Sequence, residues 1–404
     1  MRRSPRAPSP RWTVLAVALA VQTAISLVAA AMPVLLPFVK DEFHLTFAQA
    51  GLVVNFSFMG GFLTIALAGL AVDSLGDRFV LVLGGLLTGG VAMVSALVGN
   101  FWILLPVLVL MGAGIAMPTP AGSIAVRNAF PLRLRGSVMS IRQTGIPLGA
   151  FFAALILPPV AILGGWRAAM ALAGALSIFV ALAALAIYRT TGRPEPVAGE
   201  VRGLRNVMNR DSLVAATAGI FLVASQMSIV TYLVAYLIHD RRLALTTAAA
   251  ILAVAQLAGA GGRILWGVVS DRLLGGSRRT ALLLAAATGA AGSLTLALLP
   301  VSTPLPVLVA AILISSMGAV GWNGVQISFL SELARPGTEG RNVGLALMIQ
   351  QPGILVGPFL FGLVIDLAGS FRPAWLLMTG FLLTAMAVMA ATHERPRAFD
   401  RQVA

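Results

Sequence analysis

The sequence predicts an all-α membrane protein in which twelve transmembrane helices form two similar six-helix bundles. Of its 404 residues, 58% are hydrophobic and 10% are charged, and the mean hydropathy is +0.94. A soluble protein of this size could not cover so much apolar surface with so few charges. The uncharged runs are long enough to cross a bilayer, which takes about 20 helical residues. In addition, two short landmarks recur about half a chain apart.

Each half contains six predicted spans, and short loops between them make neighbouring helices antiparallel. In the first half the spans are approximately Trp12–Phe38, Ala48–Val72, Phe79–Val98, Phe101–Val126, Ser137–Val160 and Trp166–Ile187. In the second half they are approximately Ser212–Ile238, Thr246–Val269, Ala281–Leu299, Leu305–Leu330, Asn342–Leu367 and Pro373–Ala391. We therefore predict an N-terminal bundle (1–187), a cytoplasmic linker (188–211), a C-terminal bundle (212–391) and a cytoplasmic tail (392–404).

The positions of the charges explain the net charge of +14. Twenty of the 28 Lys and Arg residues fall in the N-terminal tail, alternate loops and the C-terminal tail, whereas five fall in the opposite loops. This bias follows the positive-inside rule and places both termini in the cytoplasm. We therefore expect a multi-pass protein of a bacterial inner membrane that contacts lipid and binds no nucleic acid. We also expect it to act as a monomer.

The two landmarks are duplicated at nearly the same spacing. Gly69-Leu-Ala-Val-Asp73 recurs as Gly267-Val-Val-Ser-Asp271, an offset of 198 residues. Ile141-Arg-Gln-Thr-Gly145-Ile-Pro-Leu-Gly149 recurs as Ile349-Gln-Gln-Pro-Gly353-Ile-Leu-Val-Gly357, an offset of 208 residues. In a membrane protein, two similar halves indicate a transporter with its substrate site between the halves.

The first landmark supports a family resemblance. The segment Gly69-Leu-Ala-Val-Asp73-Ser-Leu-Gly76-Asp77-Arg78 follows the second span, and Gly267-Val-Val-Ser-Asp271-Arg272 follows the eighth. With these motifs the chain resembles the major facilitator superfamily along nearly its whole length. The resemblance implies a secondary transporter whose two bundles rock around a central site. Ser74 and Asp77 depart from the pattern, because the family usually carries basic residues there.

The same signature implies a conformational latch. In the family, a carboxylate at the position of Asp73 caps the N-terminus of the eleventh helix, here near Asn342, in one state only. Such a contact contributes about 0.3–1 kcal/mol when exposed. Asp271 would have the matching role beside the fifth helix; the alternative is that Asp73 is a satisfied interfacial residue. The residues expected to form the latch are Gly69, Asp73, Gly76, Arg78, Gly267, Asp271 and Arg272.

Arg263 is the main candidate for substrate binding. It lies inside the eighth span, where a guanidinium costs about 2.5–3.5 kcal/mol on insertion scales. The segment resembles the eighth helix of oxalate–formate exchangers and monocarboxylate transporters, in which an Arg followed by Trp-Gly binds the substrate carboxylate. A planar guanidinium also donates two parallel hydrogen bonds to a carboxylate. Two other readings remain open: snorkelling to the headgroups, or an ion pair with an acid such as Glu332.

Arg142 is a second candidate, because its repeat counterpart is the neutral Gln350 and the fold therefore does not demand a charge there. Its place near the cytoplasmic face equally suits a structural pair with Asp73 or with a headgroup. Other polar residues of the spans are candidates for lining the site, although each could equally be a helix–helix hydrogen bond. They are Gln22, Tyr232, Gln256, Asn323 and Gln326.

Several residue types are missing from the predicted pathway. The chain has no Cys, so it has no disulfide or thiolate metal site, and we expect no metal, no cofactor and no enzymatic activity. The middles of the first, fourth, seventh and tenth spans hold no Asp, Glu or His. We therefore predict transport of a small organic anion, a mono- or dicarboxylate, without coupling through a buried carboxylate. The alternatives are an exporter of drugs or other small solutes, which would want an acidic residue in the pocket if its substrate is cationic, and a non-transporting membrane sensor.

Overall fold

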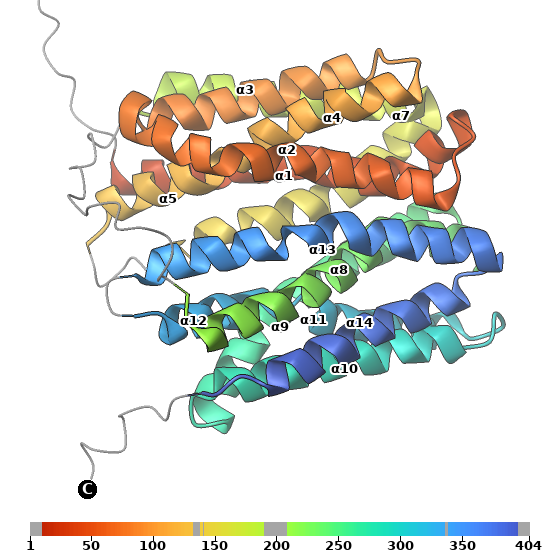
Figure 1. Cartoon of the computed structure of the whole chain (residues 1–404). Coiled ribbons are helices and arrows are strands. Elements are labelled where there is room, and N and C mark those ends of the chain that lie inside the picture. The colour runs from red at the N-terminus through yellow and green to blue at the C-terminus, as the bar shows by residue number, and fades with distance from the viewer. Residues whose placement is uncertain (1–9, 132–137, 140, 190–207, 336–337, 395–404) are drawn as a thin grey trace, which may run out of the picture. The chain divides into compact units, whose positions relative to one another are not determined.

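The computed structural model describes residues 10–131, 138–139, 141–189, 208–335 and 338–394. Every regular element in these residues is a helix (Figure 1). The chain divides into two compact units. Unit 1 comprises Met1–Leu45, Leu52–Gly199 and Leu245–Ala253; unit 2 comprises Thr46–Gly51, Glu200–Ala244 and Val254–Ala404.

Unit 1 contains most of the helices of the first half. Helix α1 packs against α7, and α3 packs against both α4 and α7. The elements are α1 (Arg11–Glu42), α2 (Phe47–Leu75), α3 (Asp77–Ser95), α4 (Phe101–Ala116), α5 (Pro118–Ala129) and α7 (Gly145–Ile187). The first turn of α2 is the exception, because it is counted with unit 2.

Unit 2 repeats this arrangement with the second half of the chain. Helix α8 packs against α13, and α10 packs against both α11 and α14. The elements are α8 (Arg210–His239), α9 (Leu245–Val268), the π-helical turn η2 (Val269–Leu273), α10 (Arg278–Leu298), α11 (Leu305–Ala319), α12 (Asn323–Leu333), α13 (Glu339–Ala368) and α14 (Arg372–Ala390). The beginning of α9, Leu245–Ala253, is the exception, because it is counted with unit 1.

The helices agree with the twelve predicted spans. Ten helices within the described residues are long and apolar enough to cross a membrane. One of them, Ile141–Ile187, changes direction at Gly165, whose φ of +77° is not helical, so it contains two predicted spans. Helix α2, with the apolar stretch Phe47–Phe62, is the remaining span. The predicted fold class is therefore confirmed.

The fourth span of each unit is broken in its middle. In unit 1, α4 ends at Ala116 and α5 begins at Pro118, whose ring removes a backbone N–H donor and bends the helix. In unit 2, α11 ends at Ala319 and α12 begins at Asn323. Broken helices occur in transporters where the substrate binds. The two breaks therefore indicate where to look for the site.

The repeated glycines let helices approach closely within each unit. A Cβ atom on Gly149 of α7 would lie 2.5 Å from the carbonyl oxygen of Thr23 in α1. A Cβ atom on its counterpart Gly357 of α13 would lie 2.5 Å from the carbonyl oxygen of Ala224 in α8. Small residues at such crossings allow the van der Waals contact that holds helices together in lipid. The second landmark of the sequence is thus a packing surface.

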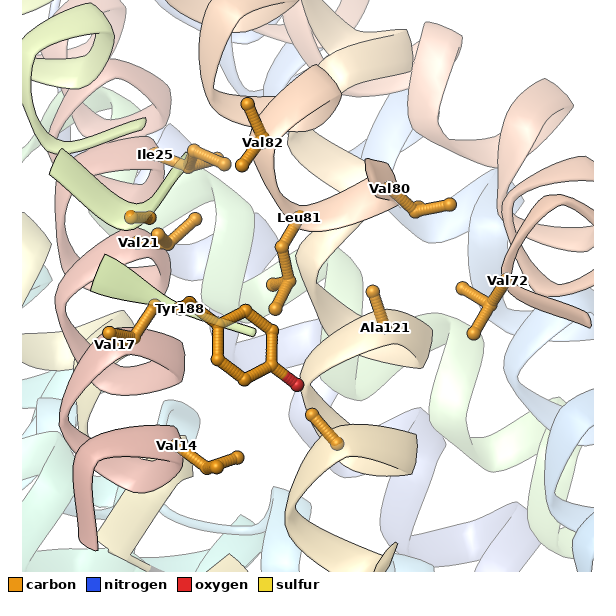
Figure 2. Close-up of a cluster of buried hydrophobic side chains, with 12 residues drawn as sticks. Val14, Val17, Val21, Ile25, Val72, Val80, Leu81, Val82, Ala121 and Tyr188 are labelled. Carbon is orange, nitrogen blue, oxygen red and sulfur yellow. The ribbon is translucent and has the colours of Figure 1, made fainter. Parts of the chain in front are cut away.

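A cluster of buried side chains holds α1, α3, α5 and the end of α7 together in unit 1. Figure 2 shows the Tyr188 ring among the aliphatic side chains of this cluster. The Tyr188 hydroxyl donates to Asp77, at 2.6 Å, and Asp77 is only 1% exposed. The acidic residue that departs from the family pattern is thus hydrogen-bonded to the residue that directly follows the sixth span.

We expect Gly149→Ala to lower the stability of the protein. The added methyl group would meet the α1 backbone, and overpacking of this kind costs about 1–3 kcal/mol. The measurement is the unfolding temperature of the purified protein in detergent. Gly380→Ala is the matched control, because a Cβ atom there meets nothing within 4 Å. Equal unfolding temperatures for the two variants would contradict this account of the repeat.

Candidate functional site

Arg142 lies beside the break in the fourth span of unit 1. It belongs to the helical turn just before α7, and its side chain is completely buried. Its Nη1 atom lies 3.4 Å from the carbonyl oxygen of Pro118, the first residue of α5, and 3.3 Å from Oε1 of Gln22. Gln22 in turn donates to the hydroxyl of Ser26, at 3.2 Å. The interaction therefore joins the first, fourth and fifth spans.

The Arg142 guanidinium retains unused hydrogen-bonding capacity. Its Nε and Nη2 atoms are buried and have no hydrogen-bond partner. A guanidinium has five N–H donors, and an ion in an apolar interior costs several kcal/mol unless it is paired. Gly122 leaves room for the group, since a Cβ atom there would lie 3.2 Å from Nη1. Complete burial also means that Arg142 does not reach the headgroups in this conformation.

Unit 2 contains a neutral version of the same junction. Gln326 of α12 donates to the carbonyl oxygen of Ala215, at 3.1 Å, and Nε2 of Gln350 is buried without a partner. A Cβ atom on Gly219 of α8 would lie 2.5–2.6 Å from the side chains of Gln326 and Gln350. The fold thus places polar side chains at this junction in both units, but only Arg142 carries a charge.

Arg263 lies beside the break in the fourth span of unit 2. On the same helix, Trp266 donates from Nε1 to the carbonyl oxygen of Met317, at 2.9 Å, which holds α9 against α11. The carbonyl oxygen of Arg263 lies 3.9 Å from where a Cβ atom on Gly324 would sit, in the first turn of α12. Arg263 is thus next to the start of this half-helix.

The Arg263 side chain is not neutralised within the described part of the chain. Its Nε atom is buried without a hydrogen bond, and none of the ion pairs found there includes Arg263. Glu332, the partner considered from the sequence, pairs with Arg278 at 3.2 Å. Unlike Arg142, Arg263 is partly exposed. Arg263 thus retains the capacity to bind an anion.

Asn323 begins α12 and pairs with a residue that the sequence reasoning missed. Its Nδ2 atom donates to Oε1 of Gln226 in α8, at 2.8 Å. Both side chains are half-buried. A glutamine inside an apolar span was the available signal, because uncompensated polar groups are costly in lipid. Gln226 therefore joins the candidate residues of unit 2.

The other candidates lie in different surroundings. Gln256 is half-buried on α9, seven residues or about two turns before Arg263. Tyr232 is fully buried, its hydroxyl donates to the carbonyl oxygen of Phe47, at 2.6 Å, and its ring stacks on Phe361. Gln22 and Gln326 belong to the junctions described above. Tyr232 is thus not beside Arg263 or Asn323 in any contact that the structure shows.

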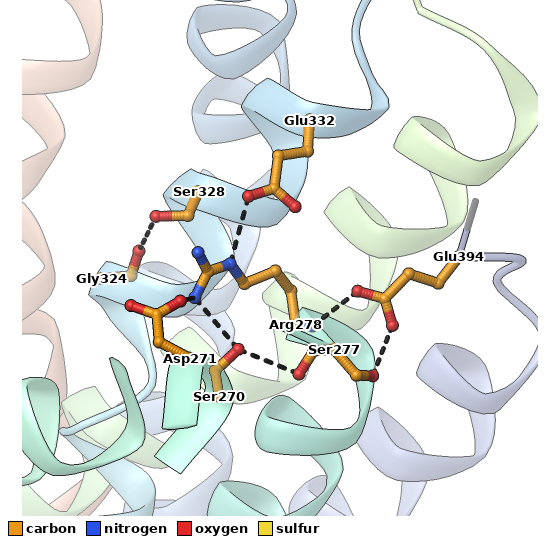
Figure 3. Close-up of polar contacts among 8 residues, drawn as sticks. All are labelled: Ser270, Asp271, Ser277, Arg278, Gly324, Ser328, Glu332 and Glu394. Carbon is orange, nitrogen blue, oxygen red and sulfur yellow. Dashed lines mark hydrogen bonds and ion pairs between the residues drawn. The ribbon is translucent and has the colours of Figure 1, made fainter. Parts of the chain in front are cut away.

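The predicted latch residues of unit 2 form a polar network at the end of α9 (Figure 3). Asp271 lies in η2 and pairs with Nη1 of Arg278, at 2.7 Å. The same nitrogen donates to Ser270, at 3.0 Å, and Arg278 also pairs with Glu332. Glu394 accepts from the backbone N–H of Arg278, at 2.6 Å. Asp271 is therefore already paired inside its own unit.

In unit 1, Asp73 lies in the last turn of α2, and the surroundings of Gly69 and of the Asp73 side chain are outside the described part of the chain. Gly76 has φ of +88°, which explains the glycine between α2 and α3. Arg78 donates to the carbonyl oxygen of Leu185 near the end of α7. A Cβ atom on Gly267 would have no neighbour within 4 Å. Arg272 is exposed. The contacts of the latch candidates in the described part of the chain therefore do not show the predicted latch.

The described residues contain no group of three or more His, Cys, Asp or Glu side chains that could hold a metal ion. Each unit contains one arginine next to a broken helix, and none of the ion pairs found in the described residues includes either of them. Guanidinium groups bind anions and support no covalent chemistry by themselves.

Comparison with known proteins agrees with this geometry. Residues 15–358 match the Major Facilitator Superfamily. An uncharacterised transporter of this type from Mycobacterium tuberculosis is 29% identical over 392 residues, which cover 96% of this chain and 86% of the relative. Monocarboxylate transporter 13 of Bos taurus is 27% identical over 317 residues, covering 78% of this chain and 73% of the relative.

The fold also matches a solved structure. A bacterial homologue of the human lysosomal transporter Spinster, in an inward-facing and occupied conformation, superposes with a TM-score of 0.78. The identity is 18%, and the match covers 94% of this chain and 96% of the other. These matches confirm the predictions of a multi-pass membrane transporter and of a protein that is not an enzyme. The chain belongs to the Major Facilitator Superfamily.

Proposed function

We propose that this transporter moves a small organic anion, a mono- or dicarboxylate, across a bacterial inner membrane by alternating access. The observation that carries the proposal is the pair Arg142 and Arg263. Each arginine lies next to the break in a fourth span, because the Arg142 guanidinium contacts Pro118 and the backbone of Arg263 lies beside Gly324. None of the ion pairs found in the described residues includes either arginine. A carboxylate would supply the missing acceptors.

The electrostatics of the spans favour an anion over a cation. The first, fourth, seventh and tenth spans have no Asp, Glu or His in their middle. A cationic drug would therefore find no counter-ion there and would meet two guanidinium groups instead. With no titratable acid in the pathway, exchange, uniport or joint transport of the anion with a proton are the coupling modes that remain.

The two arginines differ in access, which suits a transport cycle. Arg263 is partly exposed, whereas Arg142 is completely buried. We infer that Arg263 contacts the anion in this conformation and that Arg142 becomes accessible in another. The sequence similarity to a monocarboxylate transporter supports the substrate class. The predicted cytoplasmic location of both termini and the monomeric state belong to the same proposal.

We expect Arg263→Gln to weaken carboxylate binding by about 10- to 100-fold, since a hydrogen bond to a charged group contributes about 1.5–3 kcal/mol. Arg263→Lys should retain only part of the affinity, because Lys lacks the planar fork. The measurement is the thermal shift of the purified protein with lactate, oxalate and succinate. Arg242→Gln, which removes an exposed loop charge, is the control. Undiminished stabilisation of Arg263→Gln would exclude Arg263 from the site.

We expect Arg142→Gln to fold normally and to lose transport. The variant copies Gln350 of the second unit, and it removes a buried unpaired charge that costs several kcal/mol. Its unfolding temperature should therefore equal or exceed that of the native protein, while uptake of labelled carboxylate into proteoliposomes falls. A lower unfolding temperature with unchanged uptake would assign Arg142 a structural role.

The inner latch predicted from the family signature is part of the proposal. We expect Asp73→Asn to slow transport several-fold while carboxylate binding stays unchanged, because the carboxylate would stabilise one state of the cycle. Asp41→Asn, which removes an exposed carboxylate elsewhere in the chain, is the control. Equal transport rates for Asp73→Asn and the native protein would remove Asp73 from the mechanism.

A further inference from the structure

The first turn of α2 is bound inside unit 2. Thr46–Gly51 belongs to that unit, whereas the rest of α2 is counted with unit 1. The Asp366 carboxylate accepts from the backbone N–H of Phe47, at 2.8 Å, and from that of Ala48, at 2.7 Å. Both carboxylate oxygens are therefore used to cap the N-terminus of α2.

The position of Asp366 is unfavourable for its own helix. It lies in the last turn of α13, where the helix dipole disfavours a negative charge. At the N-terminus of α2 the same charge meets free backbone N–H groups and the positive end of a dipole. The capping contact thus offsets the unfavourable interaction between the Asp366 carboxylate and the dipole of α13. Loss of the contact would leave that interaction uncompensated.

Tyr232 provides a second hold on the same turn. Its hydroxyl donates to the carbonyl oxygen of Phe47, at 2.6 Å, and its ring stacks on Phe361 with the centroids 5.2 Å apart. The Phe47 ring packs edge-on against His239 and Phe371. The first turn of α2 is therefore held through its backbone and through an aromatic side chain.

Two glycines make the close approach possible. A Cβ atom on Gly362 of α13 would lie 2.5 Å from the carbonyl oxygen of Phe47. A Cβ atom on Gly51 of α2 would lie 2.6 Å from the hydroxyl of Tyr232 and 3.0 Å from the carbonyl oxygen of Pro358. Any larger residue at either position would push the turn away. Steric fit and polar contacts thus converge on one docking geometry.

We propose that Asp366, Tyr232 and Gly362 form an outer latch that holds the first turn of α2 and is released and remade in each transport cycle. The latch acts at the opposite end of α2 from Asp73, the residue predicted to act at the inner face. The offset of 208 residues that relates the second landmark to its copy places Pro158 opposite Asp366, so the first half supplies no second carboxylate latch. One helix would thus be held at its two ends in different states.

The test uses the absence of native cysteine in the chain. Ala48→Cys places a single thiol in the docked turn, where Ala48 is 8% exposed. A membrane-impermeant maleimide applied from outside should label it slowly in the otherwise native protein. Asp366→Asn should raise the labelling rate by about five- to tenfold, the effect of losing a helix N-cap. Tyr232→Phe and Gly362→Ala should also raise the labelling rate without changing the charge. The first removes the hydrogen bond to Phe47, and the second adds a methyl group that meets the Phe47 backbone.

Matched controls separate the latch from general loosening. Asp240→Asn removes another carboxylate, at the residue that directly follows α8. Gly380→Ala adds a methyl group at a position where nothing lies within 4 Å of the added atom. Neither should change the labelling rate. Equal labelling of Asp366→Asn, Gly362→Ala and the controls would overturn the latch, as would labelling from the inner side alone. The measurement needs no substrate, so its result is independent of the proposed anion specificity.

Discussion

Because hydrocarbon offers no hydrogen bonds, every polar group of a membrane-embedded chain must be satisfied from within. Hydroxyl groups meet this constraint by bonding to the preceding turn, as Ser228 does with the carbonyl oxygen of Ala224, at 2.8 Å. Ser177 of α7 meets it across helices by donating to the carbonyl oxygen of Gly85 in α3, at 3.0 Å. Several buried polar atoms of the described residues remain without a hydrogen bond, and those of Arg142 and Arg263 belong to arginines next to broken helices. The proposed substrate would supply the acceptors that these two lack.

The internal repeat shows which features the scaffold requires. The junction of the first, fourth and fifth spans contains Gln22 and Arg142 in unit 1, and Gln326 and Gln350 in unit 2. A glycine makes room in both, but it comes from the fourth span in unit 1 and from the first in unit 2. Polar side chains and space are thus structural, whereas the positive charge is specific to one half. The two junctions thus share their polar character and differ in charge.

Sequence reasoning was most reliable where the signal is local. Span lengths, the duplicated glycines and the family motif each depend on residues close together in the chain. The role of Asp366 could not be predicted, because acidic residues are common at the ends of spans. Its partner Phe47 is also 319 positions away in the sequence. Tyr232 is a candidate for lining the site or for a helix–helix hydrogen bond, and its hydroxyl donates to the same turn of α2. Gln226 was passed over because its pairing with Asn323 depends on how two distant helices meet.

By itself the sequence determined the membrane-spanning all-α fold, the two halves and the family, because hydrophobic length and repetition are properties of the linear chain. It also showed that the excess charge of the spans is positive. Only the tertiary structure decided which polar groups are satisfied. In the described residues, none of the ion pairs includes Arg142 or Arg263, whereas Asp77, Asp271 and Asp366 each have a hydrogen-bond or ion-pair partner. The physical reason is that a hydrogen bond depends on angstrom-scale distances between residues far apart in sequence, which packing alone sets.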